Sequence, residues 1–406
     1  MTPPTSAVGI PFFEPSAYPD AVDAAGAEPV PLRLPAARPT GGVALAREWA
    51  ADATEISCAE AGLDALLLAS DHPEDLFGML LAAVRLDLPT VCAPPPGTPL
   101  SATLTALGFG PLSGDVAGVV AELSQRDGPR PSALLDNFSL ANALRAGVAA
   151  GGGPELFVHL SALAREAGVV GFSQMIRVLA PETPASEPAW TRENGVPALL
   201  ASLGDGLHDA PTVAGRLKDG LPSVPGARKE HHRLVFVRAL ASGAEVVCRV
   251  PAGALNVAGQ CRVFGSEAAA VRAVREGEIS DETMLVVNGS GPRGGAGLLR
   301  LDALGVALWG AGLRTPVVTD GLSPADAVGP WACAFTPEAA MGGVIGRLRD
   351  GDALRLDLEG GHIRAGIKAG ELEAREPFEA TEQIGAGYAA RYGRSALPAL
   401  EGAGFG

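Results

Sequence analysis

The pattern of apolar residues changes once along this chain, near residue 226, and this change limits the folds that the chain can adopt. In the first half, the apolar run Ala65–Ala69 is short and flanked by turn-forming residues, which is typical of a buried strand. Residues 75–86 follow with helical spacing, and the run Pro89–Ala93 indicates the next strand. Strands that alternate with helices form a parallel sheet covered by helices. The first half therefore predicts an α/β domain.

Short β-like runs replace this alternation after residue 231. Leu354, Leu356 and Leu358 alternate with other side chains, as in a strand with one buried face. Further runs of this kind, separated by glycine-rich turns, lie at residues 233–240, 245–250, 284–287, 316–319 and 362–367. Many short strands joined by such turns form a barrel or a sandwich. We expect a mostly-β, barrel-like second domain.

These patterns divide the chain into four parts. Residues 1–40 contain many prolines and little periodicity, so we expect a poorly structured N-terminal segment. The α/β domain is expected over residues 41–225 and the β-barrel-like domain over residues 226–375. Residues 376–406 are expected to form a helical tail that packs back on the first domain.

The composition excludes several classes of partner. The net charge of −15 argues against nucleic acid and anionic membranes, because both bind clustered Lys and Arg. No apolar run approaches the ~20 residues of a membrane span, and Met1–Ala7 lacks the pattern of a signal peptide. Glycine and proline make up about a fifth of the chain, but a hydrophobic content of 47% favours a folded protein over a disordered one.

The cysteines are scattered along the sequence. They are Cys58, Cys92, Cys248, Cys261 and Cys333, and none of them belongs to a C-x-x-C pair. This scatter predicts reduced thiols in a cytoplasmic protein, and it argues against a disulfide framework or a zinc site.

Several motifs occur in a fixed order along both halves. They are Gly78–Leu86, Gly151-Gly152 and His159–Gly168 in the first half, and Gly291–Gly297, Gly310–Leu313, Val317–Gly321, Thr336–Gly343 and Asp350–Asp352 in the second. From about Gly42 onward, this series resembles the dihydroxyacid dehydratase / phosphogluconate dehydratase family. The resemblance implies an α/β domain and a barrel-like domain, with the active site between them, in a homodimer.

The resemblance also implies a set of catalytic groups, from which this sequence departs. Family members hold an iron–sulfur cluster on three cysteines and a magnesium ion on carboxylates and a modified lysine, and a serine removes the proton. Here the first forty residues and the stretch between Cys92 and Cys248 contain no cysteine. Ser290 and Arg293 replace a glutamate and a lysine, and Pro324 replaces the catalytic serine. We therefore expect no Fe–S cluster and no dehydration by the family's mechanism.

A metal site is one interpretation of three neighbouring polar residues. Asp71, His72 and Glu74 lie where a predicted strand ends and a helix begins, and ligands bind at the carboxyl ends of strands in open α/β sheets. Carboxylates and an imidazole could hold a divalent metal such as Mg²⁺. The alternative is an acidic first helical turn that interacts favourably with the helix dipole.

Three side chains are candidates for catalysis: Asp326, Ser323 and His232. Asp326 and Ser323 lie in the loop of the lost catalytic serine, where loop capping is an equally good explanation of Asp326. His232 and its neighbour His231 could act as an acid/base pair, since histidine titrates near neutral pH, or could belong to a solvated linker. His159 lies on an apolar helix face, so we expect a core histidine there.

Binding of a small polar acid is expected near the glycine-rich loop. Ser290, Arg293 and Gly294, together with Asp320 and with Gly152 of the first domain, are the predicted substrate-binding residues. Backbone N–H groups and a guanidinium are suited to a carboxylate or a phosphate. The alternative is a tight turn between strands.

Two classes of function remain open. One is a cluster-independent lyase or isomerase that acts in the interdomain cleft on a small polar hydroxy or amino acid or a specialised metabolite of a biosynthetic reaction. The other is a non-catalytic scaffold or partner subunit that keeps the fold. A conventional dihydroxyacid dehydratase with displaced ligands is a third interpretation.

Overall fold

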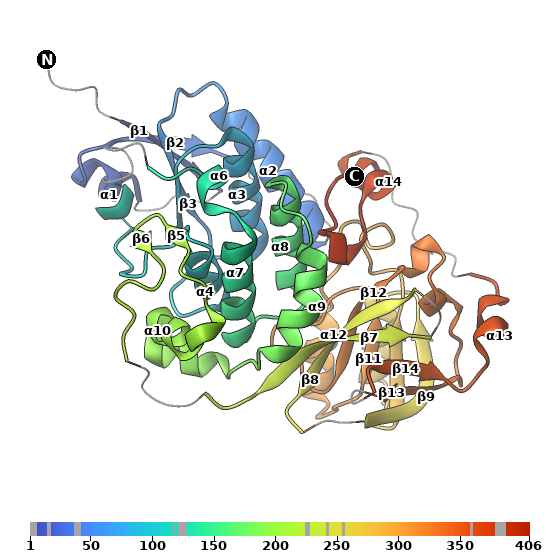
Figure 1. Ribbon diagram of the computed structural model, residues 1–406. Helices are drawn as coiled ribbons and strands as arrows, with labels where there is room; N and C mark the ends of the chain where they lie inside the picture. The colour runs from blue at the N-terminus through green and yellow to red at the C-terminus, as the bar shows by residue number, and fades with distance from the viewer. Residues whose placement is uncertain are drawn as a thin grey trace, which may run out of the picture.

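The computed structural model describes residues 6–13, 18–35, 42–116, 118–120, 128–223, 228–240, 243–253, 256–357, 360–377 and 387–406. An α/β domain, coloured blue to green in Figure 1, lies beside a barrel coloured yellow to orange. The predicted fold class is therefore confirmed. The predicted boundary at residues 225 and 226 lies outside the described residues.

The α/β domain is built on a parallel sheet with the strand order β2-β1-β3-β4. The central strand β3 (Ala65–Ala69) and the last strand β4 (Thr90–Ala93) lie where the sequence predicts strands. Leu66, Leu67 and Leu68 are almost completely buried. Burial on both faces explains why β3 is a continuous apolar run rather than an alternating one.

The N-terminal segment contains more structure than the sequence analysis predicts. The described part forms β1 (Ala7–Phe12), α1 (Tyr18–Ala24) and β2 (Glu28–Arg33), and β1 pairs with β3. The prolines of β2 argue against a strand, since proline has no backbone N–H to donate. The strand forms nevertheless, because β2 lies at the edge of the sheet, where missing donors are tolerated. The prediction for residues 1–5, 14–17 and 36–40 lies outside the described residues.

Helices cover this sheet and pack on one another (Figure 1). They are α2 (Val43–Cys58), α3 (Pro73–Leu86), α4 (Pro99–Ala106), α6 (Pro131–Leu134), α7 (Asn137–Ala149), α8 (Glu155–Glu166), α9 (Phe172–Glu182) and α10 (Pro188–Ser202). A glycine lets α3 approach α2 closely, since a Cβ atom at Gly78 would lie 2.4 Å from the Arg47 carbonyl oxygen. Short elements follow: η1 (Gly204–Gly206), β5 (Pro211–Thr212) and β6 (Gly215–Arg216).

The second domain is a closed barrel of mixed strands with the order β10-β11-β12-β8-β7-β14-β13-β9. Its strands are β7 (His232–Ala239), β8 (Glu245–Pro251), β9 (Asn256–Phe264), β10 (Thr283–Val287), β11 (Val317–Thr319), β12 (Trp331–Thr336), β13 (Ala353–Asp357) and β14 (His362–Ala365). The sequence analysis did not identify β9 and β12. In β9, Gly259 is partly exposed and Gln260 is exposed, so these residues do not form an apolar pattern.

Parallel neighbours in the barrel are connected through helices. The helix α11 (Glu267–Arg275) joins β9 to β10, and α12 (Asp302–Gly310) joins β10 to β11. The other short helices are η2 (Ala339–Met341), η3 (Val344–Arg347) and α13 (Ala369–Glu373). Apolar side chains such as Val246, Val286 and Leu356 fill a core of this domain.

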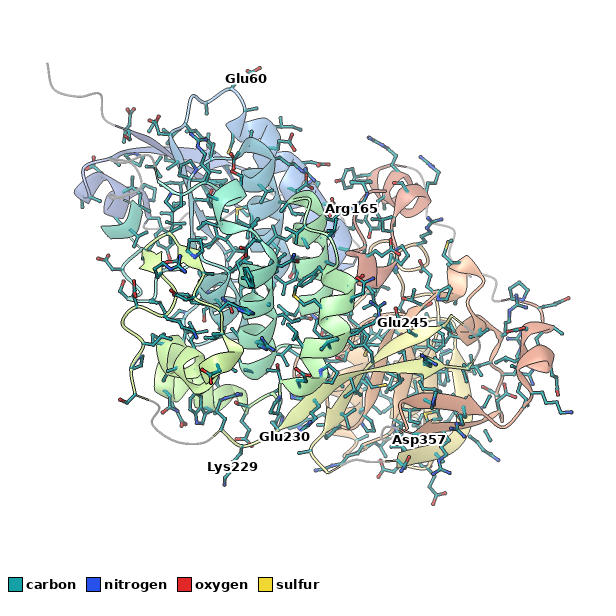
Figure 2. The ribbon with its side chains drawn as sticks, in the orientation of Figure 1. Glu60, Arg165, Lys229, Glu230, Glu245 and Asp357 are labelled. Atoms are coloured by element: carbon teal, nitrogen blue, oxygen red, sulfur yellow. The ribbon has the colours of Figure 1, made fainter. Side chains whose placement is uncertain are left out.

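The two domains share an apolar interface on the outer face of β7 and β8. Leu234 and Val247 are buried in the same cluster as the core of the α/β domain, and the ring centroid of Phe236 lies 5.5 Å from that of Phe157. Glu245, labelled at the junction in Figure 2, accepts a 2.9 Å hydrogen bond from Nε of Arg177 on α9.

The C-terminal tail lies against α2 and α8. It contains α14 (Tyr388–Ser395) and η4 (Ala399–Glu401). The guanidinium of Arg47, which is fully buried, donates to the carbonyl oxygens of Gly402 at 2.6 Å and Val158 at 3.2 Å. The Tyr388 hydroxyl lies 3.0 Å from a carboxylate oxygen of Asp52. Across the described ranges, every helix is too short or too polar to cross a lipid bilayer.

Candidate functional site in the interdomain pocket

A pocket of about 240 Å³ opens where the carboxyl ends of β3 and β4 meet the barrel domain. Its lining residues are Asp71, Pro73, Phe77, Pro95, Thr98, Pro99, Leu100, Thr103, Gly151, Gly152, Gly153, Glu155, Leu156, His159 and Ala325. Ala325 belongs to the loop after β11, in which the resemblance places the lost catalytic serine. The pocket therefore lies where open α/β sheets bind ligands and where the resemblance predicts a site between domains.

The starts of three helices shape this pocket. Pro73 occupies the first turn of α3, and Thr98 caps α4 in a reciprocal pair with Ser101. The turn from α7 into α8 needs glycine, because Gly151 has a φ of 98° and a Cβ atom at Gly152 would lie 2.8 Å from the Gly147 carbonyl oxygen. These local features hold the pocket walls in place.

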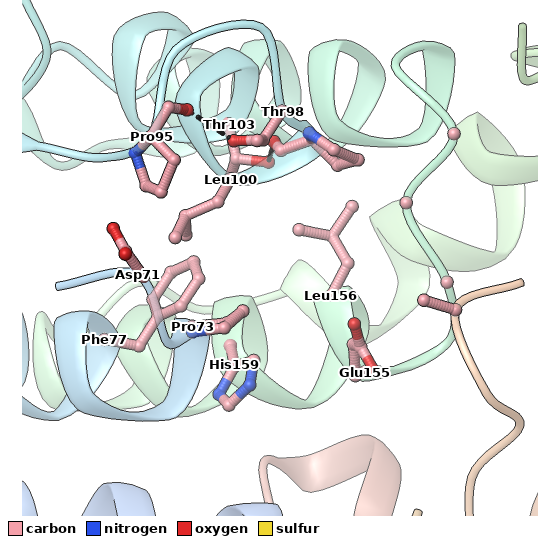
Figure 3. Close-up of a pocket in the computed structure, with 15 residues that line it drawn as sticks. Asp71, Pro73, Phe77, Pro95, Thr98, Leu100, Thr103, Glu155, Leu156 and His159 are labelled. Carbon is pink, nitrogen blue, oxygen red and sulfur yellow. Dashed lines mark hydrogen bonds between the residues drawn. The ribbon is translucent and has the colours of Figure 1, made fainter. Parts of the chain in front are cut away.

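Glu155 is the most deeply placed carboxyl group of the pocket. Its side chain is 18% exposed and lies 3.5 Å from the Arg300 guanidinium, which also contacts Asp302 at 3.0 Å. Burial raises the pKa of Glu155, and the nearby Arg300 opposes this shift. Figure 3 shows Glu155 and Asp71 at opposite ends of the pocket, with Phe77 and His159 between them. Glu155 thus holds its proton to a higher pH than an ordinary glutamic acid does.

His159 has a packing role and also lines the pocket. It is 2% exposed, and its ring stacks on Phe77 with centroids 4.8 Å apart. Burial, followed by the charges of Arg47 and Arg300, lowers the pKa of His159 well below its usual value. Its Nδ1 atom has no hydrogen-bond partner among the described residues. His159 is therefore a neutral imidazole at physiological pH.

The predicted metal ligands are not gathered around one point. Asp71 lines the pocket, whereas His72 is exposed at the start of α3 and donates its backbone N–H to Ser70 at 3.1 Å. Glu74 is half-buried, and its Oε2 atom has no partner in the described part of the chain. The described residues contain no group of three or more His, Cys, Asp or Glu side chains that could hold a metal ion. These three side chains, as placed, do not form a ligand set.

The cysteines do not fit an iron–sulfur cluster. Cys58 and Cys92 lie in the α/β domain, the other three lie in the barrel, and none lines the pocket. Within the described residues, no three Cys, His, Asp or Glu side chains come together as a group that could hold a metal, and all five thiols are buried. The described residues therefore contain no set of cysteines that converge on a site for an iron–sulfur cluster.

Two carboxylates of the chain accept hydrogen bonds from backbone N–H groups of the glycine-rich loop. Asp320 is fully buried and accepts hydrogen bonds from the backbone N–H groups of Gly289 at 3.1 Å, Ser290 at 2.8 Å and Ala339 at 3.0 Å. Burial raises its pKa, and these bonds oppose the shift. Asp320, which directly follows β11, therefore holds the loop in place through these hydrogen bonds.

Glu338 binds the next part of the same loop. Its carboxylate accepts from the backbone N–H groups of Arg293 and Gly294, each at 3.0 Å, and burial raises its pKa to about 7. The Arg293 side chain donates through Nε to the Ala396 carbonyl oxygen at 3.0 Å. Of the predicted substrate-binding residues, Gly152 lines the pocket, while Ser290, Arg293, Gly294 and Asp320 belong to this internal network.

The three predicted catalytic residues lie near the pocket but do not line it. Asp326 is exposed beside Ala325, and Ser323 is buried with no hydrogen-bond partner for Oγ among the described residues. His232 is 1% exposed, and burial, followed by the charge of Arg249, lowers its pKa to about 3. His232 therefore stays neutral and does not exchange protons near neutral pH.

Sequence reasoning missed Glu155, the most suitable acid of the pocket. The signal was available, because Glu155 opens a helix directly after the glycines that include the predicted Gly152. Arg300, its partner, lies in the other domain, and no sequence pattern connects the two residues.

Comparison with known proteins agrees with this geometry. The domain described as "Dihydroxy-acid/6-phosphogluconate dehydratase C-terminal" matches residues 229–403. A dihydroxy-acid dehydratase of Geotalea daltonii is 31% identical over 307 residues, which cover 68% of this chain and 56% of the relative. The dihydroxy-acid dehydratase of Citrifermentans bemidjiense is 32% identical over 304 residues, covering 67% of this chain and 55% of the relative.

The match extends across the domain junction, and the matched part spans little more than half the length of these curated relatives. The barrel, the glycine-rich loop and the interdomain pocket are in the positions that the resemblance implies. The chain is therefore a member of the dihydroxy-acid dehydratase family.

Proposed function

We propose that this chain is an enzyme that acts on a small metabolite in the interdomain pocket by proton transfer, as a cluster-independent lyase or isomerase. A small hydroxy or amino acid is the substrate class under this proposal, and the working form is a homodimer in the cytoplasm. The observation that carries the proposal is Glu155, a largely buried carboxyl group with a raised pKa in the wall of a pocket between two domains. Acid/base groups of enzymes are tuned in this way by burial.

The residues of the pocket support a division of roles. Glu155 can give a proton to a leaving group or take one from carbon, and Arg300 at 3.5 Å stabilises its anionic form. The neutral imidazole of His159 and the ring of Phe77 form a rigid stacked wall against which a ligand can be oriented. Apolar side chains such as Leu100 and Leu156 exclude water from the reacting atoms.

Deuterium exchange tests this proposal without assuming one particular reaction. The purified protein, analysed for iron and sulfide, is incubated in D₂O with a set of hydroxy and amino acids, and NMR follows exchange at carbon and product formation. We expect exchange or turnover in iron-free protein and a loss of about 100-fold or more in Glu155→Gln. Glu60→Gln, the same substitution at an exposed glutamate outside the pocket lining, is the matched control.

The other outcomes identify the competing functions. Stoichiometric iron and sulfide, with activity that chelation abolishes, would show a conventional dehydratase. Absence of exchange with every compound, combined with stable association with another enzyme, would show a scaffold or partner subunit.

A further inference from the structure

We infer that the ligand of the interdomain pocket carries a cationic amino group on a small apolar body. This inference rests on the proposed function, because it concerns the same pocket and the same acid/base group, Glu155. It replaces the hydroxy or amino acid of that proposal with an amine that carries no carboxylate. It starts from the ionisable side chains in the lining, which are Asp71, Glu155 and His159, with no arginine or lysine among the lining residues.

Asp71 is the carboxylate that is free to meet such a group. It is exposed at the end of β3, lines the pocket and has no ion-pair partner within the described ranges of the chain. Figure 3 shows its carboxylate at the opposite end of the pocket from Glu155. An ammonium group placed there would gain a charge-assisted hydrogen bond.

The surroundings of the pocket add negative charge. Arg300 is shared between Glu155 at 3.5 Å and Asp302 at 3.0 Å, and Glu74, half-buried nearby, also acts on both Arg300 and Glu155. His159 is neutral and contributes no cation. Arg47, the other cation that acts on His159, is paired with Glu48 at 2.7 Å. Carboxylates therefore outnumber the unpaired cations around the pocket even when Glu155 is protonated, which repels an anionic ligand and attracts an ammonium ion.

Helix starts at the pocket would favour an anion if their charge were uncompensated. The first turn of α3 already contains Glu74 and Asp75, and the first turn of α8 contains Glu155. The start of α4 is capped by Thr98, whose Oγ1 accepts from the Ser101 N–H. The partial positive charges of these helices are thus largely matched by the chain's own side chains.

The groups that could receive a carboxylate are used elsewhere. The N–H groups of Ser290, Arg293 and Gly294 donate to Asp320 and Glu338, and the Arg293 guanidinium donates to a carbonyl oxygen of the tail. The remaining walls are apolar, with Phe77, Leu100 and Leu156 as their largest members. An apolar body with an amino head matches this lining, whereas a hydroxy acid leaves its carboxylate without a cation.

Calorimetry with three compounds that share one branched chain tests the head group directly. Isopentylamine, isopentanol and 4-methylpentanoate are titrated into the full-length protein at pH 7 and low ionic strength. We expect the amine to bind about tenfold more tightly than the alcohol, and the carboxylate to bind most weakly. Asp71→Asn should reduce amine affinity about five- to tenfold and leave alcohol affinity unchanged. Glu60→Gln, which removes an exposed carboxylate outside the lining, should change neither.

Three outcomes would overturn the inference. They are tighter binding of the carboxylate than of the amine, an amine affinity that Asp71→Asn does not change, and the failure of all three compounds to bind. None of them decides the proposed function, because deuterium exchange measures that separately and includes hydroxy acids. A bulky Leu156→Trp substitution fills the pocket and should abolish amine binding, so unchanged binding in this variant would place the amine elsewhere.

Discussion

Each domain contributes one pair of carboxylates near the domain junction, and the two pairs differ in whether backbone N–H groups donate to them. Asp320 and Glu338 in the barrel are buried under backbone N–H groups that donate to them. Asp71 and Glu155 in the α/β domain line a pocket, and among the described residues no backbone N–H group donates to either side chain. The comparison teaches that a carboxylate stabilises the fold where loops supply backbone N–H donors to it. Where no such donors are present, the carboxylate remains available to a ligand.

This difference also explains why the motifs shared with the family gave a partial guide to the site. The glycine-rich loop keeps its position at the end of β10, but its N–H groups point at Asp320 and Glu338. The pocket is lined almost entirely by the other domain, and Ala325 is the one lining residue from the barrel.

Removing Asp320, the carboxylate that accepts hydrogen bonds from three backbone N–H groups, should have the largest effect on stability. Asp320→Ala leaves three buried or partly buried N–H groups without an acceptor, so we expect the free energy of unfolding to fall by about 3–5 kcal/mol. Urea unfolding followed by far-UV circular dichroism measures this change. A loss below about 1 kcal/mol would show that the loop does not depend on this anion.

Acid should destabilise the protein through His232. Its pKa is about 3 in the folded protein, below the ordinary value of 6.5, so the unfolded chain binds more protons between these values. The contribution of His232 to stability is therefore complete above about pH 6.5 and is lost as the pH falls toward 3. His232→Phe should remove about 3 kcal/mol of the decline between pH 6.5 and 4, measured by urea unfolding at each pH. An unchanged pH profile in this variant would contradict the assignment.

Glu338 should act in the opposite direction. Its folded pKa of about 7 exceeds the ordinary value of 4.5, so the folded protein binds more protons and stability falls as the pH rises from 4.5 to 7. Glu338→Gln should flatten this fall by about 2 kcal/mol between pH 5 and 7. A slope that Glu338→Gln leaves unchanged would contradict this assignment.

The smallest effect on stability is expected at the pocket. Asp71→Asn should change the free energy of unfolding by less than about 0.5 kcal/mol, because no part of the described structure donates to this exposed carboxylate. A loss comparable to that of Asp320→Ala would remove the distinction between the two carboxylate pairs.

Much of the fold could be predicted from local patterns. The strand Ala65–Ala69, the helix Pro73–Leu86 and most barrel strands follow directly from apolar periodicity and turn residues. The strand β2 was missed because Pro29 and Pro31 are unfavourable in a strand unless it lies at an edge, and only the assembled sheet shows that position.

The sequence by itself determined the family series, the two-domain architecture and the scattered positions of the five cysteines. The tertiary structure alone decided which polar groups face a ligand. Ser290 and Arg293 are plausible binding residues in the sequence, but the structure shows that their backbone N–H groups donate to Asp320 and Glu338. Glu155 is one of many acids in the sequence, and only the structure places it next to Arg300 of the other domain. The physical reason is that the role of a charged group depends on its burial and its partners, and residues far apart in the chain supply both.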